Sequence, residues 1–395
     1  MIIVIGMGAD GMAGLSPQSR SELLRAKVIY GSSRQLALLD AKLSAHRRQW
    51  PAPLLPALSS LFGDLAECDG DVHVLASGDP MLHGIGVTLV RLFGAERVKV
   101  LPHISAVTLA RARMSWTDHN TEVINLVTAP PHTALRRGGQ AIVLSRDAET
   151  PVTVARLLAT HGRGKSLVTV LEQLGGPRER RRDATAADWA ARPPDDIDEL
   201  NVLAVRYLPD ERLSSSIPDD LFDHDGQITK QSMRALTLAA LAPRPGERLW
   251  DVGSGSGSVA IEWGRSGSGC TAVAFEKDIA RRARITRNAI AFGVNIDVRG
   301  EAPNAFDGAA APAAIFVGGG LTQHNVLDAC LRHLPMGGRL VANAVTAESE
   351  ILVTQAHRRF GGTLQRFQHY HSEPLGGFTA WRPQLPITQW SVTRP

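Results

Sequence analysis

The stretch from Leu249 to Ser258 constrains the fold of this chain more than any other part of the sequence. It reads as an apolar strand that ends in Asp251-x-Gly253-x-Gly255-x-Gly257 and then opens a helix. Alternating glycines allow a tight turn and let a ligand approach the backbone closely. Glu276 follows about 20 residues later, at the end of the next expected strand, where a carboxylate can accept hydrogen bonds from both ribose hydroxyls. The segment therefore predicts a nucleotide-binding α/β domain.

The spacing of the glycines separates two classes of cofactor. A dinucleotide needs G-x-G-x-x-G so that its pyrophosphate meets the helix N-terminus, whereas the spacing here is G-x-G-x-G. No lysine follows as in a P-loop. The segment resembles the first motif of class I S-adenosylmethionine (SAM) methyltransferases, whose cofactor has no phosphate and carries an amino-acid end and a sulfonium cation. A NAD-type site and a glycine-rich turn without a ligand remain as alternatives.

The expected strands and helices alternate in two series. The chain has 395 residues, enough for two or three domains. A polar, serine-rich and proline-flanked seam at 208–218 separates the series, and the alternation predicts mostly parallel sheets covered by helices. We expect a first domain over 1–210, a linker over 211–222 and a second domain over 223–395, closed by a proline-broken tail from Pro383.

Composition restricts the partners and the location. The 43 Lys+Arg and 39 Asp+Glu leave a net charge of +4, which argues against a nucleic-acid binder and suits an anionic small molecule. Cys68, Cys270 and Cys330 lie far apart, which indicates neither a disulfide framework nor a zinc motif, and we expect no metal. No apolar run approaches the ~20 residues of a membrane helix, and the N-terminus lacks the features of a signal peptide. We expect a cytoplasmic protein.

Three turns in the first half each follow an expected strand. They are Gly6-Met7-Gly8, Ser77-Gly78-Asp79-Pro80, which precedes a helix opening at Gly84, and Pro102-His103-Ile104-Ser105. Their order and spacing resemble the tetrapyrrole (corrin/porphyrin) methylases, a class III SAM fold of two α/β lobes. Segments 171–175 and 201–205 are similar to later motifs of that family. The departures from its usual pattern are Ala9, His103 and Ala106, where proline, glycine and serine are common.

The two halves together are similar to the decarboxylating precorrin C5,15-methyltransferases, fused enzymes of cobalamin (vitamin B12) biosynthesis. In the second half, segments 228–230, 316–320 and 337–345 fit this family. The resemblance implies a two-lobed tetrapyrrole methylase fold followed by a Rossmann-like class I methyltransferase fold. It implies SAM-dependent methylation of precorrin-6B at C5 by the first domain and at C15 by the second. It also implies loss of CO2 from the ring-C acetate to give precorrin-8X, an anionic tetrapyrrole substrate and a homo-oligomer.

The resemblance also assigns residues to two SAM sites. The first site is expected to contain Gly6, Gly8, Ser77, Asp79, Gly84, Ile85 and Ser105. The second is expected to contain Thr229, Gly253, Gly255, Gly257, Glu276 and Glu301. No catalytic acid or base stands out. Asn343 and His324 are candidates for handling a proton, although a surface position is the favoured interpretation of His324. Asp79 could instead cap a turn.

Two arginine clusters are candidates for binding substrate carboxylates, because a guanidinium can donate two parallel hydrogen bonds to a carboxylate. For the row from Arg281 to Arg287, a solvated helix face is the favoured interpretation. For the cluster from Arg178 to Arg182, a plain loop and a contact with substrate or partner are equally favoured.

Other classes of protein remain open. A dinucleotide oxidoreductase would need the third glycine in register and leaves the turn at 77–80 unexplained. A sensor or scaffold protein would bind SAM without transferring a methyl group. A class I RNA or other small-molecule methyltransferase is the nearest alternative, but the low net charge and the lack of a basic, aromatic-rich appendage argue against RNA.

Overall fold

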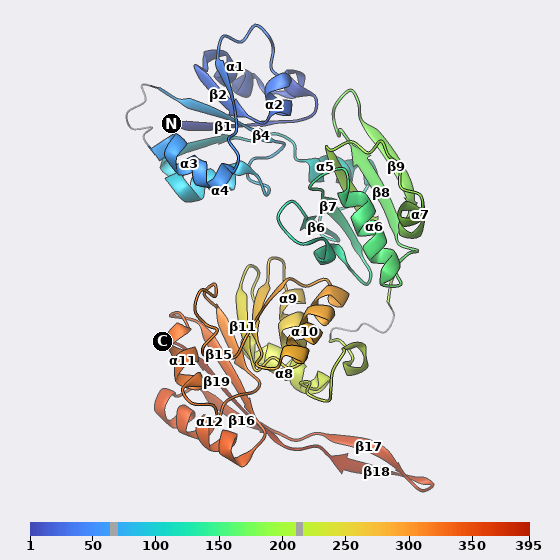
Figure 1. Ribbon diagram of the computed structural model, residues 1–395, viewed down its shortest axis with the longest axis vertical. Coiled ribbons are helices and arrows are strands. Elements are labelled where there is room, and N and C mark those ends of the chain that lie inside the picture. Colours follow the sequence, from blue (N-terminus) through green and yellow to red (C-terminus); the bar gives the residue numbers. More distant parts are fainter. Residues whose placement is uncertain (64–69, 211–215) are drawn as a thin grey trace. The chain divides into compact units, whose positions relative to one another are not determined.

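The computed structural model of the chain describes residues 1–63, 70–210 and 216–395. These residues form two compact units, Met1–Pro209 and Asp210–Pro395 (Figure 1). Cys68 and the part of the expected linker at 211–215 lie outside the described residues. Cys270 and Cys330 are free, buried thiols. Within the described ranges, no helix is long and apolar enough to cross a membrane.

The first lobe of the first unit is a parallel sheet in the order β3-β2-β4-β1-β5. Strand β1 lies between β4 and β5 and is buried along its whole length, which explains its unbroken apolar sequence. Helix α1 begins at Pro17, and the Ser16 hydroxyl caps it by accepting a hydrogen bond from the Ser19 N–H. The elements are β1 (Ile2–Met7), α1 (Pro17–Arg25), β2 (Val28–Gly31), α2 (Ser33–Ala37), β3 (His46–Gln49), α3 (Leu54–Gly63), β4 (Val72–Ser77), α4 (Ile85–Phe93) and β5 (Val98–Leu101).

The second lobe corrects the prediction of a mostly parallel sheet. Its order is β6-β7-β10-β8-β9, and among these neighbours β6 and β7 alone pair in parallel. Residues 173–179 between β8 and β9 are too few for a helical crossover, so these strands pair antiparallel. The elements are α5 (Ala106–Met114), β6 (Thr121–Asn125), β7 (Gln140–Leu144), α6 (Thr150–Thr160), β8 (Leu167–Glu172), β9 (Arg180–Thr185), α7 (Ala186–Ala191) and β10 (Asn201–Arg206).

The second unit is a three-layer α/β domain around a sheet in the order β13-β12-β11-β14-β15-β19-β16. Helices α8, α9 and α10 cover one face, and α11 and α12 cover the other (Figure 1). The elements are α8 (Gln231–Leu241), β11 (Arg248–Val252), α9 (Ser258–Arg265), β12 (Thr271–Phe275), α10 (Ile279–Phe292), β13 (Ile296–Arg299), β14 (Ala314–Val317), α11 (Val326–His333), β15 (Arg339–Ala344), α12 (Ala347–Phe360), β16 (Thr363–Phe367), β17 (Tyr370–Leu375), β18 (Phe378–Pro383) and β19 (Ile387–Thr393).

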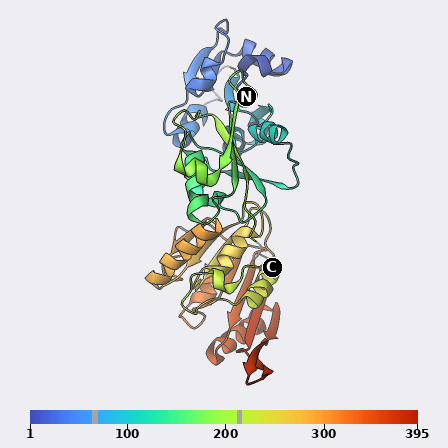
Figure 2. The ribbon, with the colours of Figure 1, turned by 90° about the vertical axis from the view of Figure 1, so that its right-hand side faces the viewer.

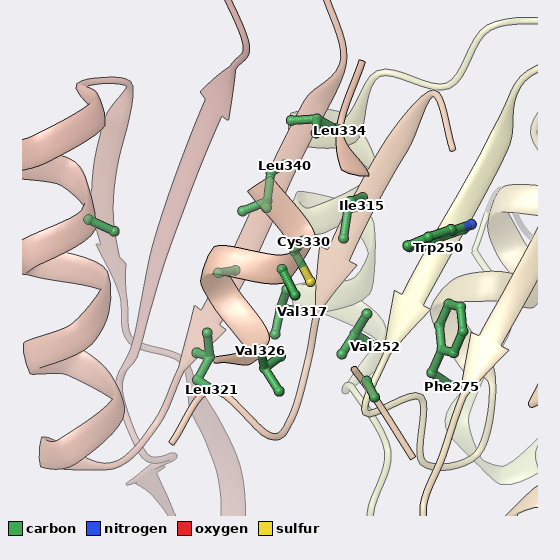
Figure 3. Close-up of a cluster of buried hydrophobic side chains, with 14 of the residues drawn as sticks. Trp250, Val252, Phe275, Ile315, Val317, Leu321, Val326, Cys330, Leu334 and Leu340 are labelled. Atoms are coloured by element: carbon green, nitrogen blue, oxygen red, sulfur yellow. The ribbon is translucent and has the colours of Figure 1, made fainter. Parts of the chain in front are cut away.

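Strand β11, which leads into the glycine loop, is fixed from both faces. Trp250 and Val252 point into the core under α11, together with Phe275 (Figure 3). Leu249 points into the opposite core, against Trp263 of α9. Because β11 is packed on both faces, the loop that follows it starts from a fixed position.

The prediction of a proline-broken tail from Pro383 is wrong. Residues 387–393 form β19, which pairs antiparallel with both β15 and β16, and Trp390 of this strand is fully buried. The prolines lie before the strand and leave its backbone N–H groups free to pair. Just before it, the β17–β18 hairpin extends away from the sheet in both views (Figures 1 and 2).

Candidate active sites

A cavity of about 420 Å³ lies at the carboxyl ends of the strands of the first unit. The loops after β1, β2, β4 and β5 line it from the first lobe. The second lobe contributes the ends of β6, β7 and β8 and the start of β10. This edge is where open α/β sheets bind ligands, and the volume falls within the roughly 300–1,000 Å³ of small-molecule pockets. We call this cavity the first pocket.

The predicted residues of the first site meet around this pocket, with one exception. Gly8, Ser77, Asp79, Gly84, Ile85 and Ser105 line it. Gly6 does not. A Cβ at Gly6 would stand 2.2 Å from the carbonyl oxygen of Gly78 and 2.7 Å from the backbone nitrogen of His103. Gly6 therefore lets three loops pack together, and its contribution to the pocket is one of shape.

The polar residues of the first pocket already have protein partners. The Ser105 hydroxyl caps α5 by accepting from the Thr108 N–H at 3.0 Å. The Asp79 carboxylate accepts from the Met81 N–H at 2.9 Å, as expected of a turn cap. A carboxylate or hydroxyl oxygen can accept more than one hydrogen bond, so these contacts leave capacity for a ligand.

Sequence reasoning missed the part of the first pocket that comes from α2 and the second lobe. Arg34 lines the pocket from α2, and Asn125, Leu171 and Asn201 line it from the second lobe. The later family motifs at 171–175 and 201–205 contained a signal for the last two. Nothing in the sequence around Arg34 distinguishes it from a surface arginine.

A second pocket of about 450 Å³ lies at the carboxyl edge of the sheet in the second unit. It lies beside the ends of β11, β12, β14 and β15 and the start of β19. The predicted residues that line it are Thr229, Gly253, Gly255, Glu276, Glu301 and Asn343. Gly257 and His324 do not line it. Sequence reasoning also missed Lys277 and Ile387 as lining residues.

The three glycines of the loop have positive φ angles of 68°, 60° and 78° at Gly253, Gly255 and Gly257, a region that favours glycine. Gly257 is the N-cap of α9, and a Cβ there would stand 2.9 Å from Cγ2 of Ile285. Its contribution is therefore close packing of α9 against α10, whereas Gly253 and Gly255 face the pocket.

Glu276 lies where the sequence predicts, buried at the end of β12. Its Oε2 accepts a hydrogen bond from the Gly255 N–H at 2.9 Å, and its Oε1 accepts from the Asp278 N–H at 3.0 Å. These contacts fix the carboxylate beside the glycine loop, and each oxygen retains capacity to accept a ribose hydroxyl. The arrangement fits the sugar of a nucleoside-containing cofactor.

Asp251 supports the glycine loop from beneath. Its Oδ2 accepts from the Ser254 hydroxyl at 2.7 Å and from the Ala260 N–H at 3.1 Å, which ties the loop to α9. Its Oδ1 is buried and has no hydrogen-bond partner in the described structure. Burial raises the pKa of this carboxyl group to about 7, and the charge of Glu276 adds to the increase.

The two candidates for proton transfer differ in their surroundings. Asn343 lines the second pocket, but its amide is engaged: Nδ2 donates to Thr237 Oγ1 at 3.0 Å, and Oδ1 accepts from Gln389 Nε2 at 2.9 Å. His324 is exposed and lies outside the lining. A catalytic role for either residue stays a prediction.

The cluster from Arg178 to Arg182 is largely a structural network. Arg180 and Arg182 both donate to Glu172, a carboxylate that is almost fully buried, and both also pair with Asp196. Burial opposes ionisation of Glu172, but its hydrogen bonds from the two arginines lower its pKa. These guanidinium groups hold β9 against β8 and are not free to bind a substrate.

The arginine row on α10 is engaged as well. Arg281 and Arg284 pair with Asp225, and Arg284 and Arg287 pair with Asp223. The hydrogen bond from Arg281 is the main cause of the lowered pKa of Asp225. The row therefore anchors the segment that leads to residues 226–230, which line the second pocket.

Comparison with known proteins assigns a class to each half. Residues 1–190 match the family of tetrapyrrole (corrin/porphyrin) methylases, and residues 220–394 match the precorrin methyltransferase domain. Both are families of methyltransferases, and SAM is the methyl donor that they imply. The fold and the pockets thus define a methyltransferase built from two methyltransferase units.

Relatives narrow this class to one family. A precorrin-6Y C(5,15)-methyltransferase (decarboxylating) of Mycobacterium tuberculosis (strain CDC 1551 / Oshkosh) is 67% identical over 394 residues, covering 100% of both chains. The chain therefore belongs to the family of decarboxylating precorrin-6Y C(5,15)-methyltransferases.

Two shorter relatives each match less than half of the chain. A cobalt-precorrin-7 C(5)-methyltransferase of Salmonella typhimurium is 30% identical over 46% of this chain and 88% of its own length. A probable cobalt-precorrin-6B C(15)-methyltransferase (decarboxylating) of Saccharolobus solfataricus is 33% identical over 37% of this chain and 77% of its own length.

Proposed function

We propose that this chain methylates precorrin-6B at C5 and C15 and removes the ring-C acetate carboxyl group as CO2, giving precorrin-8X in cobalamin biosynthesis. The observation that carries the proposal is the presence of two pockets of small-molecule size, one in each unit, in a chain that matches a relative of this family over the whole of both sequences. The alternative of an RNA methyltransferase is not favoured, because the relative that matches the whole chain is a precorrin methyltransferase.

The proposal divides the chemistry between the units. Residues 1–210 would methylate C5, and residues 223–395 would methylate C15 and promote decarboxylation, with 211–222 as the linker. Support comes from the two shorter relatives, which each match under half of this chain and are named for one methylation each. Because the first unit resembles the tetrapyrrole methylases, we assign C5 methylation to it and C15 methylation to the second unit.

Each unit would hold its own SAM. In the first pocket, Gly8, Gly84 and Ile85 would line the cofactor and Ser77, Asp79 and Ser105 would supply polar contacts. In the second, Glu276 would accept the ribose hydroxyls, while Gly253 and Gly255 leave room at the backbone. Thr229 and Glu301 would complete that site from neighbouring loops. Gly6 and Gly257 would shape the loops without touching the cofactor.

The reaction mainly requires the protein to position the methyl donor and the tetrapyrrole relative to each other. Bound SAM would supply an activated methyl group, and each transfer to an electron-rich carbon of the macrocycle would release one proton and leave S-adenosylhomocysteine. The protein aligns the two and excludes water. No protein nucleophile is required, and burial raises the pKa of Cys330 to about 12, so its thiol is not ionised at neutral pH. Decarboxylation sends its electron pair into the conjugated ring, and a proton replaces the lost CO2.

A homo-oligomer stays a prediction from the resemblance, and a cytoplasmic location stays a prediction from the sequence. Support for self-association comes from the β17–β18 hairpin, where Phe378 is 82% exposed and Trp381 is 73% exposed. Large exposed apolar groups on a projecting element mark interaction surfaces. We expect Phe378→Ser with Trp381→Ser to lower the molar mass measured by light scattering, while Thr379→Ser leaves it unchanged. An unchanged mass in the double variant would contradict this role.

The direct test is a mass spectrum of the product formed from purified protein, SAM and freshly generated precorrin-6B. We expect a gain of two methyl groups and the loss of one CO2. One methyl group without loss of CO2 would contradict the role of the second unit, and an unchanged substrate would contradict the proposed function.

A further inference from the structure

Arg34 differs from the other arginines described in the first unit. It lines the first pocket together with mainly apolar side chains, among them Leu75, Leu82 and Leu171. Its one hydrogen-bonded partner in the described structure is the Ser77 hydroxyl, to which Nη2 donates at 2.9 Å. A guanidinium has five N–H donors, so most of its donor capacity is unused.

Its neighbours in the sequence explain how the guanidinium is held there. Helix α2 starts with a capping box: the Ser32 hydroxyl accepts from the Gln35 N–H, and the Gln35 side chain accepts from the Ser32 N–H. Gln35 Nε2 also donates to the Ser77 hydroxyl at 3.2 Å. These contacts fix the start of α2 against the end of β4, so the position of Arg34 is defined by the fold.

Comparison with Arg136 of the same unit shows what Arg34 lacks. Arg136 donates two parallel hydrogen bonds to the carboxylate of Glu122, at 2.8 and 2.7 Å. No carboxylate of the described residues lies within ion-pair distance of Arg34. Asp79 also lines the pocket, but its carboxylate accepts from the Met81 backbone, and Asp198 acts on Arg34 only through its field.

The electrostatics of Arg34 follow from this isolation. Partial burial lowers the pKa of Arg34, and the charge of Asp198 opposes this decrease without forming an ion pair. In such surroundings a charge-assisted bidentate contact with a carboxylate is stronger than at an exposed site. The first pocket thus contains one half of an ion pair, and the ligand has to supply the other half.

We propose that Arg34 is the carboxylate receptor of the first pocket and binds an anionic oxygen pair of the ligand with its guanidinium fork. The inference rests on the proposed function, which supplies two ligands with carboxylates: the amino-acid end of SAM and the acetate and propionate groups of the tetrapyrrole. In either case Arg34 is a positioning residue, because it orients a ligand whose reacting atom lies elsewhere.

The test separates the two sources of the carboxylate. Full-length chains carrying Gly255→Arg, a substitution confined to the second pocket, would be prepared with Arg34→Met, with Arg34→Lys or with neither. Calorimetry would measure binding of S-adenosylhomocysteine and of 5′-methylthioadenosine, which lacks the amino-acid carboxylate. Kinetics of C5 methylation would give KM for precorrin-6B. Arg91→Met on the exposed face of α4 is the matched control.

Arg34→Met should either weaken the binding of S-adenosylhomocysteine or raise KM for precorrin-6B, in each case by at least about tenfold. Weaker binding of S-adenosylhomocysteine with unchanged binding of methylthioadenosine would identify the methyl donor as the source. A raised KM for precorrin-6B with unchanged cofactor binding would identify the tetrapyrrole. Arg34→Lys, which keeps the charge and loses the fork, should recover part of the loss, and Arg91→Met should behave as the parent.

Two results would overturn the proposal. One is binding and KM unchanged in Arg34→Met, and the other is an equal loss for both adenosine compounds, which would mean that Arg34 only shapes the pocket. Failure of the parent chain to methylate C5 would instead count against the proposed function, and the two adenosine compounds would still test Arg34.

Discussion

The first pocket and the second pocket lie at the same kind of edge, where strands end in glycine-containing loops, but their walls differ in chemistry. The first lies between two lobes and is mainly apolar, with Arg34 as its isolated cation. The second lies on one sheet and is more polar than the first, with Glu276, Glu301, Lys230 and Lys277 among its lining residues. If each pocket holds a methyl donor, as we propose, the difference teaches that methyl transfer depends on how the sulfonium is positioned and not on one fixed set of side chains.

The loops of the two pockets are also supported differently. In the first unit, backbone packs directly on backbone at Gly6, which leaves no room for a side chain. In the second, a buried carboxylate, Asp251, holds the glycine loop by accepting hydrogen bonds from it and from α9. Substitutions can therefore disable one pocket by a route that has no counterpart in the other.

Gly255→Arg should have the largest effect, because it places a long side chain in the second pocket at a position with φ of 60°. C15 methylation and decarboxylation should disappear, whereas C5 methylation should stay within about twofold of the parent, as for distant sites. Mass spectrometry of the product checks this. Loss of both methylations in a folded variant would show that the pockets are not independent.

Gly6→Val should give the reverse pattern. Its Cβ would collide with the Gly78 carbonyl oxygen, so we expect loss of C5 methylation and a destabilisation of about 1–3 kcal/mol, as for an overpacked core. C15 methylation should persist. Gly377→Ala, where a Cβ would meet nothing within 4 Å, is the control for a harmless glycine substitution. Normal C5 activity in Gly6→Val would contradict the packing role.

Asp251→Asn should change how stability depends on pH. The folded pKa of about 7 lies above the ordinary value of 3.8, so ionisation destabilises the fold: stability should fall as pH rises from 4 to 7 and then level off. Asparagine keeps an acceptor for Ser254 and Ala260 and cannot ionise, so this decline should shrink. Calorimetric melting of both proteins across this pH range measures it, and identical profiles would contradict a buried carboxyl that ionises near neutrality.

Glu276→Gln should have the smallest of these effects. The amide presents an N–H group on one side, where the carboxylate accepts a backbone N–H and would also accept a ribose hydroxyl of the ligand. We expect S-adenosylhomocysteine to bind the second pocket about 10- to 100-fold more weakly, the equivalent of roughly 1–3 kcal/mol for an unsatisfied polar group. Binding to the first pocket, measured in the same titration, should not change and serves as the internal control.

The sequence predicted the strands that carry the glycine loops because unbroken apolar runs next to glycines have few other folds. It did not predict the antiparallel second lobe or the placement of β19 between β15 and β16, since periodicity does not specify strand partners. It placed Glu276 correctly because that position follows from one strand, loop and strand unit. Arg34 and Asn125 could not be found in this way, because the pocket that they line forms only when two lobes meet. The charges of Arg180 and Arg182 gave no sign that a buried glutamate would pair with them.

The most direct test of two independent methyl-donor sites is the stoichiometry of S-adenosylhomocysteine bound to the full-length chain, measured by calorimetry for the parent and for Gly255→Arg. We expect two molecules per parent chain and one per variant chain. One molecule per parent chain, or the loss of both in a correctly folded variant, would contradict the account.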